Sequence, residues 1–136
     1  MNRMKCNLKQ VIDEHVKTKK YFSKQELINY IYTLSHTLEY LHSKGIAHHD
    51  IKPQNILVDE KNRVFLSDLG IGHFVSQDDK SKLTYIASGT PAFMAPELKD
   101  RIIKKKDLFK TDVWGLGLVM IELADLEDTQ INLHMQ

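Results

Sequence analysis

The residues best suited to chemistry lie in one short polar segment, residues 48–55. Asp50 supplies a carboxylate, Lys52 an ammonium group and Asn55 a carboxamide. Pro53 opposes a helix through these positions, so the segment is expected to form a loop. A polar loop between apolar segments is a common place for catalytic and binding residues.

The residues that follow predict a β-hairpin that would bring a second carboxylate to this loop. Residues 56–58 indicate a short buried strand, residues 59–62 a polar turn and residues 64–67 the returning strand. In antiparallel pairing, Asn55 and Asp68 lie at the same end of the hairpin, where strands are about 5 Å apart. Carboxylate and amide oxygens suit Mg²⁺, which proteins hold through one or two carboxylates plus substrate phosphates. The spacing therefore predicts a magnesium–phosphate site close to Asp50.

The adjacent histidines His48 and His49 raise zinc as an alternative metal. Neighbouring side chains on extended backbone point in opposite directions, so the two rings cannot easily share one ion. Structural zinc sites usually need four nitrogen or sulfur ligands, and the chain has one cysteine, Cys6. His48 is instead predicted to be a packed residue that holds the loop, and His36 and His42 are predicted to be surface or packed residues.

Four motifs occur in the order found in eukaryotic protein kinases. Residues 48–55 resemble the H-R-D-L-x-x-x-N catalytic loop, and D-L-G at 68–70 resembles D-F-G. A-P-E occurs at 95–97, and T-D-V-W-G at 111–115 is similar to the start of the long buried helix that follows in that family. One tripeptide alone would carry little weight, whereas four motifs in order support a resemblance over about residues 6–125.

By this resemblance, residues 1–136 form a partial kinase catalytic domain of α+β class, mainly α with a small β-hairpin. It would be a C-lobe fragment with the N-lobe absent. The catalytic loop would span residues 46–58, the activation segment residues 68–97 and the buried helix residues 111–125. Within the activation segment, residues 89–94 would position the acceptor hydroxyl.

The resemblance also implies ATP- and Mg²⁺-dependent phosphoryl transfer to serine or threonine hydroxyls of a protein substrate. Asp50 would accept the hydroxyl proton, and Lys52 would offset the charge of the transferred group, as in the serine/threonine-specific type. Asn55 and Asp68 would hold Mg²⁺, and Leu57 would lie under the adenine. The residues expected to contact the cofactors are thus Lys52, Asn55, Leu57 and Asp68.

The chain departs from the kinase pattern in three ways. It contains no G-x-G-x-x-G and no V-A-I-K. ATP would therefore have residues beneath its adenine but no glycine-rich loop or lysine over its phosphates. The helices that normally cover the last helix, and the late arginine that pairs with Glu97, are also missing, so the 112–124 helix is expected to expose an apolar face. His49 replaces the usual arginine and is only partly charged near neutral pH, so phosphorylation of Thr84 or Ser88 is expected to switch the site weakly.

Three predicted helices should position the loop. A loose apolar spacing predicts the first over residues 7–17. Ser23 and Glu26 form a capping-box signature for the second, which should end at Gly45. Its apolar stripe consists of Leu27, Ile31, Leu34, Leu38 and Leu41. Asp112 is predicted to open the last helix, which is apolar nearly all round and should be buried on several sides.

Composition limits the classes of protein that remain. The 136 residues fit one domain, with 42% hydrophobic and 27% charged residues, as in soluble globular proteins. A net charge of +1 argues against a nucleic-acid binder, and the apolar run 114–121 is too short to span a membrane. No signal peptide is predicted, and one cysteine fits a reducing, cytoplasmic environment. Residues 99–110 are rich in cations and predict a solvated loop or, alternatively, a docking patch for acidic peptides.

Two functions remain open from the sequence. A truncated serine/threonine kinase domain, whose activity on its own stays open, is favoured because Asp50, Lys52, Asn55 and Asp68 are all present. A catalytically silent kinase-like interaction fragment is favoured by the missing phosphate cradle, since positioning supplies most of the catalysis. The expected partners are a protein substrate and a complementing kinase lobe or regulatory protein.

Overall fold

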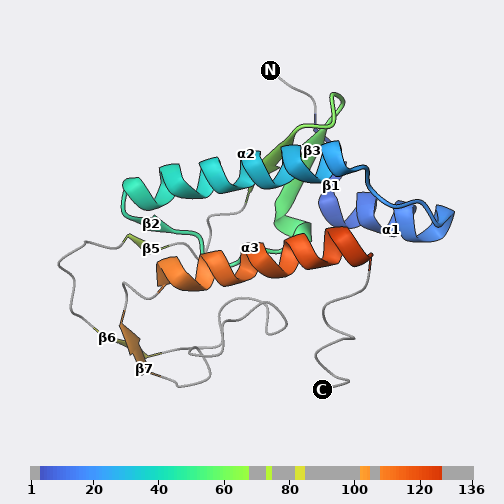
Figure 1. The fold of residues 1–136 in the computed structure, drawn as a ribbon. Helices are drawn as coiled ribbons and strands as arrows, with labels where there is room; N and C mark the ends of the chain where they lie inside the picture. The colour runs from blue at the N-terminus through green and yellow to red at the C-terminus, as the bar shows by residue number, and fades with distance from the viewer. Residues whose placement is uncertain (1–3, 68–72, 75–81, 85–101, 105–107, 127–136) are drawn as a thin grey trace.

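The computed structural model describes residues 4–67, 73–74, 82–84, 102–104 and 108–126. Helices α2 and α3 lie side by side and run in opposite directions (Figure 1). Together with a small antiparallel sheet they give the mainly helical α+β fold expected. The elements in chain order are β1 (Met4–Asn7), α1 (Leu8–Thr18), α2 (Lys24–Ser43), β2 (Ile46–Ala47), the 3₁₀ helix η1 (Pro53–Asn55), β3 (Ile56–Asp59), β4 (Val64–Leu66), β5 (His73–Phe74), β6 (Lys82–Thr84), β7 (Ile102–Lys104) and α3 (Leu108–Asp125).

Reciprocal side-chain hydrogen bonds start the first two helices. Asn7 accepts from the backbone amide of Gln10, and the Gln10 side chain accepts from that of Asn7, both at 2.9 Å. Ser23 and Glu26 form the same capping box at 3.1 Å in each direction, which confirms the predicted start of α2. Gly45, with a φ of 74°, follows the end of α2, where a left-handed residue commonly stops a helix.

The hydrophobic core lies between α1, α2, α3 and the sheet. The predicted stripe on α2 is only partly correct, because Leu34 and Leu38 are buried whereas the other three members are only partly buried. Tyr30 is 2% exposed and occupies the centre of the buried face instead. The core consists of Leu8, Ile12, Phe22, Tyr30, Leu34, Leu38, Ile51, Ile56, Val58, Val64, Leu116, Val119 and Leu123.

The main sheet contains the predicted hairpin and one strand that the sequence did not indicate. Strands β3 and β4 pair antiparallel, with Ile56 opposite Leu66, as expected. Strand β1 adds to the other edge of β3, so the strand order is β1-β3-β4. The sequence of β1, Met-Lys-Cys-Asn, alternates apolar and polar residues over only four positions, which is too short a pattern to predict a strand, and its side chains are exposed or partly buried. Two further antiparallel pairs, β2–β5 and β6–β7, complete the described strands.

Asp59 organises the turn between β3 and β4. Its Oδ1 accepts from the backbone amides of Lys61 and Arg63 at 2.9 Å, and its Oδ2 lies 2.8 Å from both Nε and Nη2 of Arg63. Burial works to raise the pKa of Asp59, but the Arg63 amide and side chain and the Lys61 amide together hold that pKa below its ordinary value of 3.8. Asn62 adopts the left-handed conformation that this tight turn requires, with a φ of 62°.

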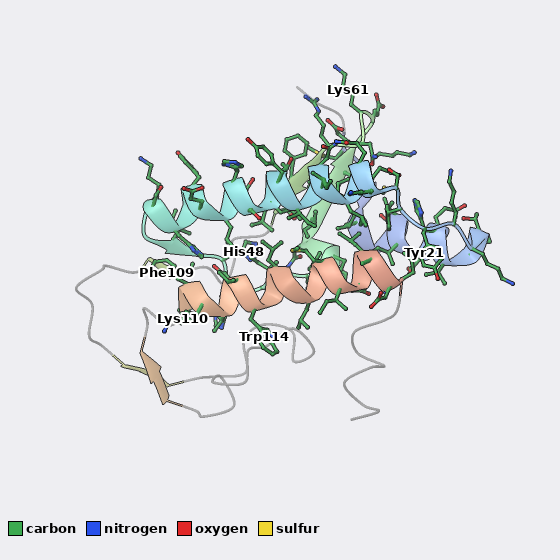
Figure 2. The ribbon with its side chains drawn as sticks, in the orientation of Figure 1. Tyr21, His48, Lys61, Phe109, Lys110 and Trp114 are labelled. Atoms are coloured by element: carbon green, nitrogen blue, oxygen red, sulfur yellow. The ribbon has the colours of Figure 1, made fainter. Side chains whose placement is uncertain are left out.

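The last helix differs from its prediction at its start and on one face. It begins at Leu108, so Asp112 does not open it but lies in its second turn. Burial on several sides is also incomplete, because Val113, Trp114 and Ile121 are 60%, 42% and 54% exposed, which confirms the expected exposed apolar face. Trp114 projects from α3 on the side away from α2 (Figure 2). None of the described helices is long and apolar enough to cross a membrane.

Candidate active site

The three side chains singled out in the polar loop lie together. The Nζ of Lys52 is 3.6 Å from Oδ2 of Asp50. The Nδ2 of Asn55 donates to the same oxygen at 3.0 Å and to the main-chain oxygen of Asp50 at 2.8 Å. The side chains of Asp50 and Lys52 are 14% and 23% exposed, so the cluster is sheltered but remains open to solvent. One carboxylate oxygen therefore receives both a cation and an amide donor.

The helix η1 explains why Asn55 folds back under Asp50. Pro53 begins η1, where its missing N–H is no loss, and the Asn55 amide donates to the main-chain oxygen of Lys52 at 3.0 Å. The main-chain oxygen of Asn55 accepts from the amide and the hydroxyl of Ser67 at 2.8 and 3.0 Å. These bonds join the polar loop to the far strand of the hairpin, in the predicted antiparallel arrangement.

Asp68 follows Ser67 directly but lies outside the described residues. So do the D-L-G and A-P-E motifs and most of the predicted activation segment and cation-rich stretch. The convergence of Asp68 with Asn55 therefore stays a prediction. The described structure places Asn55 and Ser67 beside each other, so that convergence needs no rearrangement of the hairpin.

The donor atoms of the loop fit magnesium. Both hydrogen bonds from the Asn55 side chain use Nδ2, so this assignment directs its Oδ1 to the other side of the amide group. Asp50 and Asn55 thus offer hard oxygen donors, the kind that Mg²⁺ prefers. Among the described residues there is no group of three or more His, Cys, Asp or Glu side chains that could hold a metal ion by itself.

His48 holds the loop through both ring nitrogens. The ring is fully buried, and it lies between α2 and α3 (Figure 2). Its Nδ1 accepts from the backbone amide of Asp50 at 3.1 Å, and its Nε2 lies 2.6 Å from the main-chain oxygen of Ser67. Since a carbonyl only accepts, Nε2 carries the proton. This arrangement agrees with the packed role expected for His48 and ties the backbone of Asp50 to the hairpin.

Asp112 anchors the loop, and sequence reasoning missed this role. Its carboxylate is 1% exposed and accepts from the backbone amide of His48 through Oδ2 and from that of His49 through Oδ1, each at 2.8 Å. The Nε2 of His42, on α2, lies 2.8 Å from Oδ2 as well. The available signal was an acidic residue next to a long apolar stretch of the helix, where a buried carboxylate needs partners.

Two backbone features show how closely the loop is held. His49 has a φ of 72°, a left-handed conformation that costs a non-glycine residue roughly 1–3 kcal/mol and persists only where the surroundings determine it. The hydrogen bond from its amide to Asp112 is one such determinant. On α3, a Cβ at Gly115 would lie 3.1 Å from the main-chain oxygen of Ile51 and 3.2 Å from its Cβ. Helix α3 therefore approaches the loop as closely as glycine permits.

Leu57 lies next to this cluster but on the other face of β3 from the core. Its neighbours Ile56 and Val58 are buried, whereas Leu57 is only partly buried. In the sheet it stands opposite Asn7 of β1 and Phe65 of β4. This position leaves part of the side chain accessible, as a surface under an adenine would require.

Comparison with known proteins gives a consistent result. The sequence matches the protein kinase domain family over residues 1–129. It is 43% identical over 90 residues to serine/threonine-protein kinase ppk34 of Schizosaccharomyces pombe, which covers 66% of this chain and 25% of that protein. It is 36% identical over 95 residues to CBL-interacting protein kinase 11 of Oryza sativa subsp. japonica, covering 70% and 18%. With CBL-interacting serine/threonine-protein kinase 5 of Arabidopsis thaliana the identity is 38% over 96 residues, covering 69% and 21%. The chain spans a quarter or less of the length of these relatives.

Proposed function

Because this chain belongs to the eukaryotic protein kinase family, we propose that it supplies the catalytic loop of a serine/threonine kinase domain, as a fragment of the C-lobe. The reaction is transfer of the terminal phosphoryl group of ATP to a serine or threonine hydroxyl of a protein substrate. Catalysis of this reaction depends mostly on positioning and on stabilisation of charge. The domain therefore needs a loop with a fixed shape, and the buried anchor at Asp112 supports that requirement.

The observation that carries the proposal is the meeting of Lys52 Nζ and Asn55 Nδ2 at one oxygen of Asp50. Asp50 accepts the proton of the substrate hydroxyl and orients its oxygen. Lys52, beside it, offsets the negative charge that develops on the transferred group. Asn55, through Oδ1, and Asp68 would hold Mg²⁺, which when bound neutralises phosphate charge. Leu57 would lie under the adenine ring.

The proposal includes a complementing kinase lobe or regulatory protein. These 136 residues contain no glycine-rich loop and no V-A-I-K lysine to cover the phosphates. Groups that position the phosphates contribute a large part of the rate. Transfer by this chain alone is therefore expected to be slow, and a lobe that covers the nucleotide is expected to raise it.

Calorimetric titration of the folded chain with Mg²⁺-ATP tests the proposal, with Asp68→Ala as the control. Binding of Mg²⁺-ATP that is lost in Asp68→Ala would support a nucleotide site formed by these residues. Phosphoryl transfer to a serine-containing protein, measured with a kinase lobe added, should then disappear in Asp50→Asn. Transfer that persists in Asp50→Asn, or binding that persists in Asp68→Ala, would contradict the assigned roles.

A catalytically silent interaction fragment is the second candidate, and the exposed apolar face of α3 favours it. Val113, Trp114 and Ile121 line a groove of about 530 Å³ that also includes Lys110, Gly117 and Leu118. Exposed apolar surface of this kind often marks a protein contact. A folded chain that fails to bind Mg²⁺-ATP, but associates with protein through this groove, would favour the second candidate over the first.

A further inference from the structure

Helix α3 presents an exposed, mostly apolar surface on the side away from α2, where Trp114 projects (Figure 2). Its residues recur at spacings of three and four, so at about 100° a residue they lie within about 140° of the helix circumference. From the first turn to the last, this α3 face consists of Lys110, Val113, Trp114, Gly117, Leu118, Ile121 and Asp125. All of them except Asp125 line the groove of about 530 Å³.

Gly117 makes the middle of the α3 face hollow. A Cβ at this position would meet nothing within 4 Å, so no contact among the described residues requires a glycine there. Gly115 differs, because it lies on the other side of α3, against Ile51 of the polar loop. Where two helices pack, the side chains at the contact set how closely the axes approach, so a glycine leaves room for a large side chain of the second helix. The α3 face can therefore accept such a side chain at its centre.

The charged residues at the two ends of the α3 face are placed against the helix dipole. Lys110 lies in the first turn, where positive charge is unfavourable, and Asp125 is the last residue, where negative charge is unfavourable. The first turn contains no acidic residue and the last turn no basic residue that would offset them. Both side chains are exposed. A second helix that ran antiparallel to α3 and carried the same charges would offset both.

The two charges are equally far from the middle of α3. Lys110 precedes Gly117 by seven residues, and Asp125 follows Leu118 by seven. A two-fold axis between positions 117 and 118 would therefore place Lys110 of each copy opposite Asp125 of the other. The two ion pairs are equivalent, as symmetry requires where one surface binds itself.

The apolar residues follow the same symmetry. Trp114 precedes Gly117 by three residues, and Ile121 follows Leu118 by three. The same axis places Trp114 of each copy against Ile121 of the other, and Leu118 over the hollow at Gly117. Large apolar side chains thus meet each other or a glycine, and like charges do not meet.

We propose that the α3 face binds a second copy of this chain, as an antiparallel dimer with its two-fold axis between positions 117 and 118. The dimer does not depend on phosphoryl transfer, because the polar loop packs on the other side of α3, at Gly115. Both polar loops stay open in this arrangement. The α3 face is smaller than the roughly 20–30 residues a side of a standard interface, so we expect weak association, with a dissociation constant of about 10–100 µM.

The unmodified chain provides the first test, because its single tryptophan lies on the α3 face. Sedimentation equilibrium of the 136-residue chain from about 1 to 500 µM should fit a monomer–dimer equilibrium. Over the same range the emission of Trp114 should shift to shorter wavelength, since its ring loses contact with water.

Two results of this measurement would overturn the proposal. The first is a chain that stays monomeric, whether its tryptophan is exposed, and so available to a different partner, or already covered by another part of the same chain. The second is association that continues beyond the dimer, since a two-fold interface is closed.

Ile121→Glu tests the apolar part of the α3 face, with Ile28→Glu as the matched control. Both isoleucines are exposed on helices, at 54% and 48%. Ile121→Glu should weaken association by about tenfold or more, because it places a charge against the ring of Trp114 in the other copy. Ile28→Glu, on α2, should leave the dissociation constant within about twofold. Equal effects of the two substitutions would mean that the copies meet through another surface and would overturn the proposal.

Charge reversal tests the antiparallel register. Lys110→Asp and Asp125→Lys each place like charges opposite each other twice in the dimer, so each variant alone should associate about tenfold more weakly. Both substitutions agree with the helix dipole better than the original residues, so α3 should stay folded. An equal mixture of the two variants should recover the affinity of the unmodified chain, because opposite charges then face each other. The double variant Lys110→Asp/Asp125→Lys should recover it as well.

The same variants can contradict the register. In a parallel pair of helices, Lys110 would face Lys110, so a single reversal would not weaken association. Single variants that associate as strongly as the unmodified chain would therefore overturn the proposal. A mixture that associates no better than its components would overturn it too.

Discussion

Asp59 and Asp112 are both nearly fully buried, and each accepts from two backbone amides and one basic side chain. They differ in where those donors lie along the chain. The donors to Asp59 are Lys61 and Arg63, within four residues of it. The donors to Asp112 are 63 to 70 residues away. The same chemical group therefore shapes a turn in one place and holds the polar loop of residues 48–55 in the other.

This difference determines how much each aspartate affects the rest of the molecule. The partner of Asp59, Arg63, has a side chain that is 47% exposed, so water screens their ion pair. Asp112 lies between α2, the loop and α3, and its donors have no comparable access to water. The long-range anchor should consequently be the more sensitive of the two to substitution.

Asp112→Ala should give the largest effect. It removes the acceptor of three donors in the interior, and the free energy of unfolding should fall by about 3–5 kcal/mol. Urea denaturation measures this change. Asp125→Ala, at an exposed position of the same helix, is the control and should alter stability by less than about 0.5 kcal/mol. A loss below about 1 kcal/mol in Asp112→Ala would remove the basis of the comparison.

Gly115→Ala tests the same anchor without touching a hydrogen bond. The added Cβ meets Ile51 at 3.1–3.2 Å, so α3 or the loop must shift, whereas a Cβ at Gly117 meets nothing within 4 Å. Gly117→Ala should stabilise the protein by up to about 1 kcal/mol through helix propensity. Gly115→Ala should be less stable than Gly117→Ala by about 1–3 kcal/mol in thermal or chemical denaturation. Equal stability of the two variants would mean that the loop tolerates displacement.

Tyr30→Phe examines a contact of intermediate range. The buried hydroxyl of Tyr30 on α2 donates to Oδ1 of Asn62 in the hairpin turn at 2.6 Å. Its loss should reduce the free energy of unfolding by about 1 kcal/mol, because Asn62 is exposed and water can replace the donor. Tyr32→Phe, at an exposed tyrosine on the same helix, should have little effect. If Tyr30→Phe lowered the free energy of unfolding as much as Asp112→Ala, the effect of a contact would not follow the sequence separation of its partners.

Asp59→Asn should have the smallest effect, and that effect should depend on pH. The folded-state pKa of Asp59 lies below its unfolded value, so its charge contributes stability above the unfolded pKa of about 3.8. This contribution is lost as the pH falls through the folded-state pKa. The gap between the unmodified protein and Asp59→Asn should therefore be present at pH 6 and shrink below pH 4, as measured by denaturation along a pH series. A stability difference between the two proteins that grows below pH 4 would contradict a lowered pKa of Asp59 in the folded state.

The sequence allowed the short-range features to be predicted. The capping box at Ser23 and Glu26, the hairpin and the closeness of Asp50 to Asn55 all depend on residues a few positions apart. Such features follow from local hydrogen bonding and apolar spacing, which a single sequence displays.

The features that were missed depend on contacts between distant segments. Strand β1 pairs with the open edge of β3, and the alternation of its own four residues is too short to predict a strand. Tyr30 is buried on α2 although it was not part of the predicted stripe, and its hydroxyl bonds to Asn62 in the distant hairpin turn. The role of Asp112 requires its distance from residues 48 and 49 to be known. No pattern along the chain contains that distance.

The separation between Asp112 and its donors also has a consequence for the order of folding. Closing a loop of about 64 residues costs roughly 2.4 kcal/mol more than closing one of four residues, at about 0.6 kcal/mol for each doubling. The hairpin turn at Asp59 should therefore form early, and the polar loop should become ordered only after α3 docks. Pulse-labelled hydrogen exchange during refolding should show the amides of Lys61 and Arg63 protected before those of His48 and His49. During synthesis the loop would likewise wait for Asp112, so the segment proposed to be catalytic would be among the last parts of the chain to become ordered.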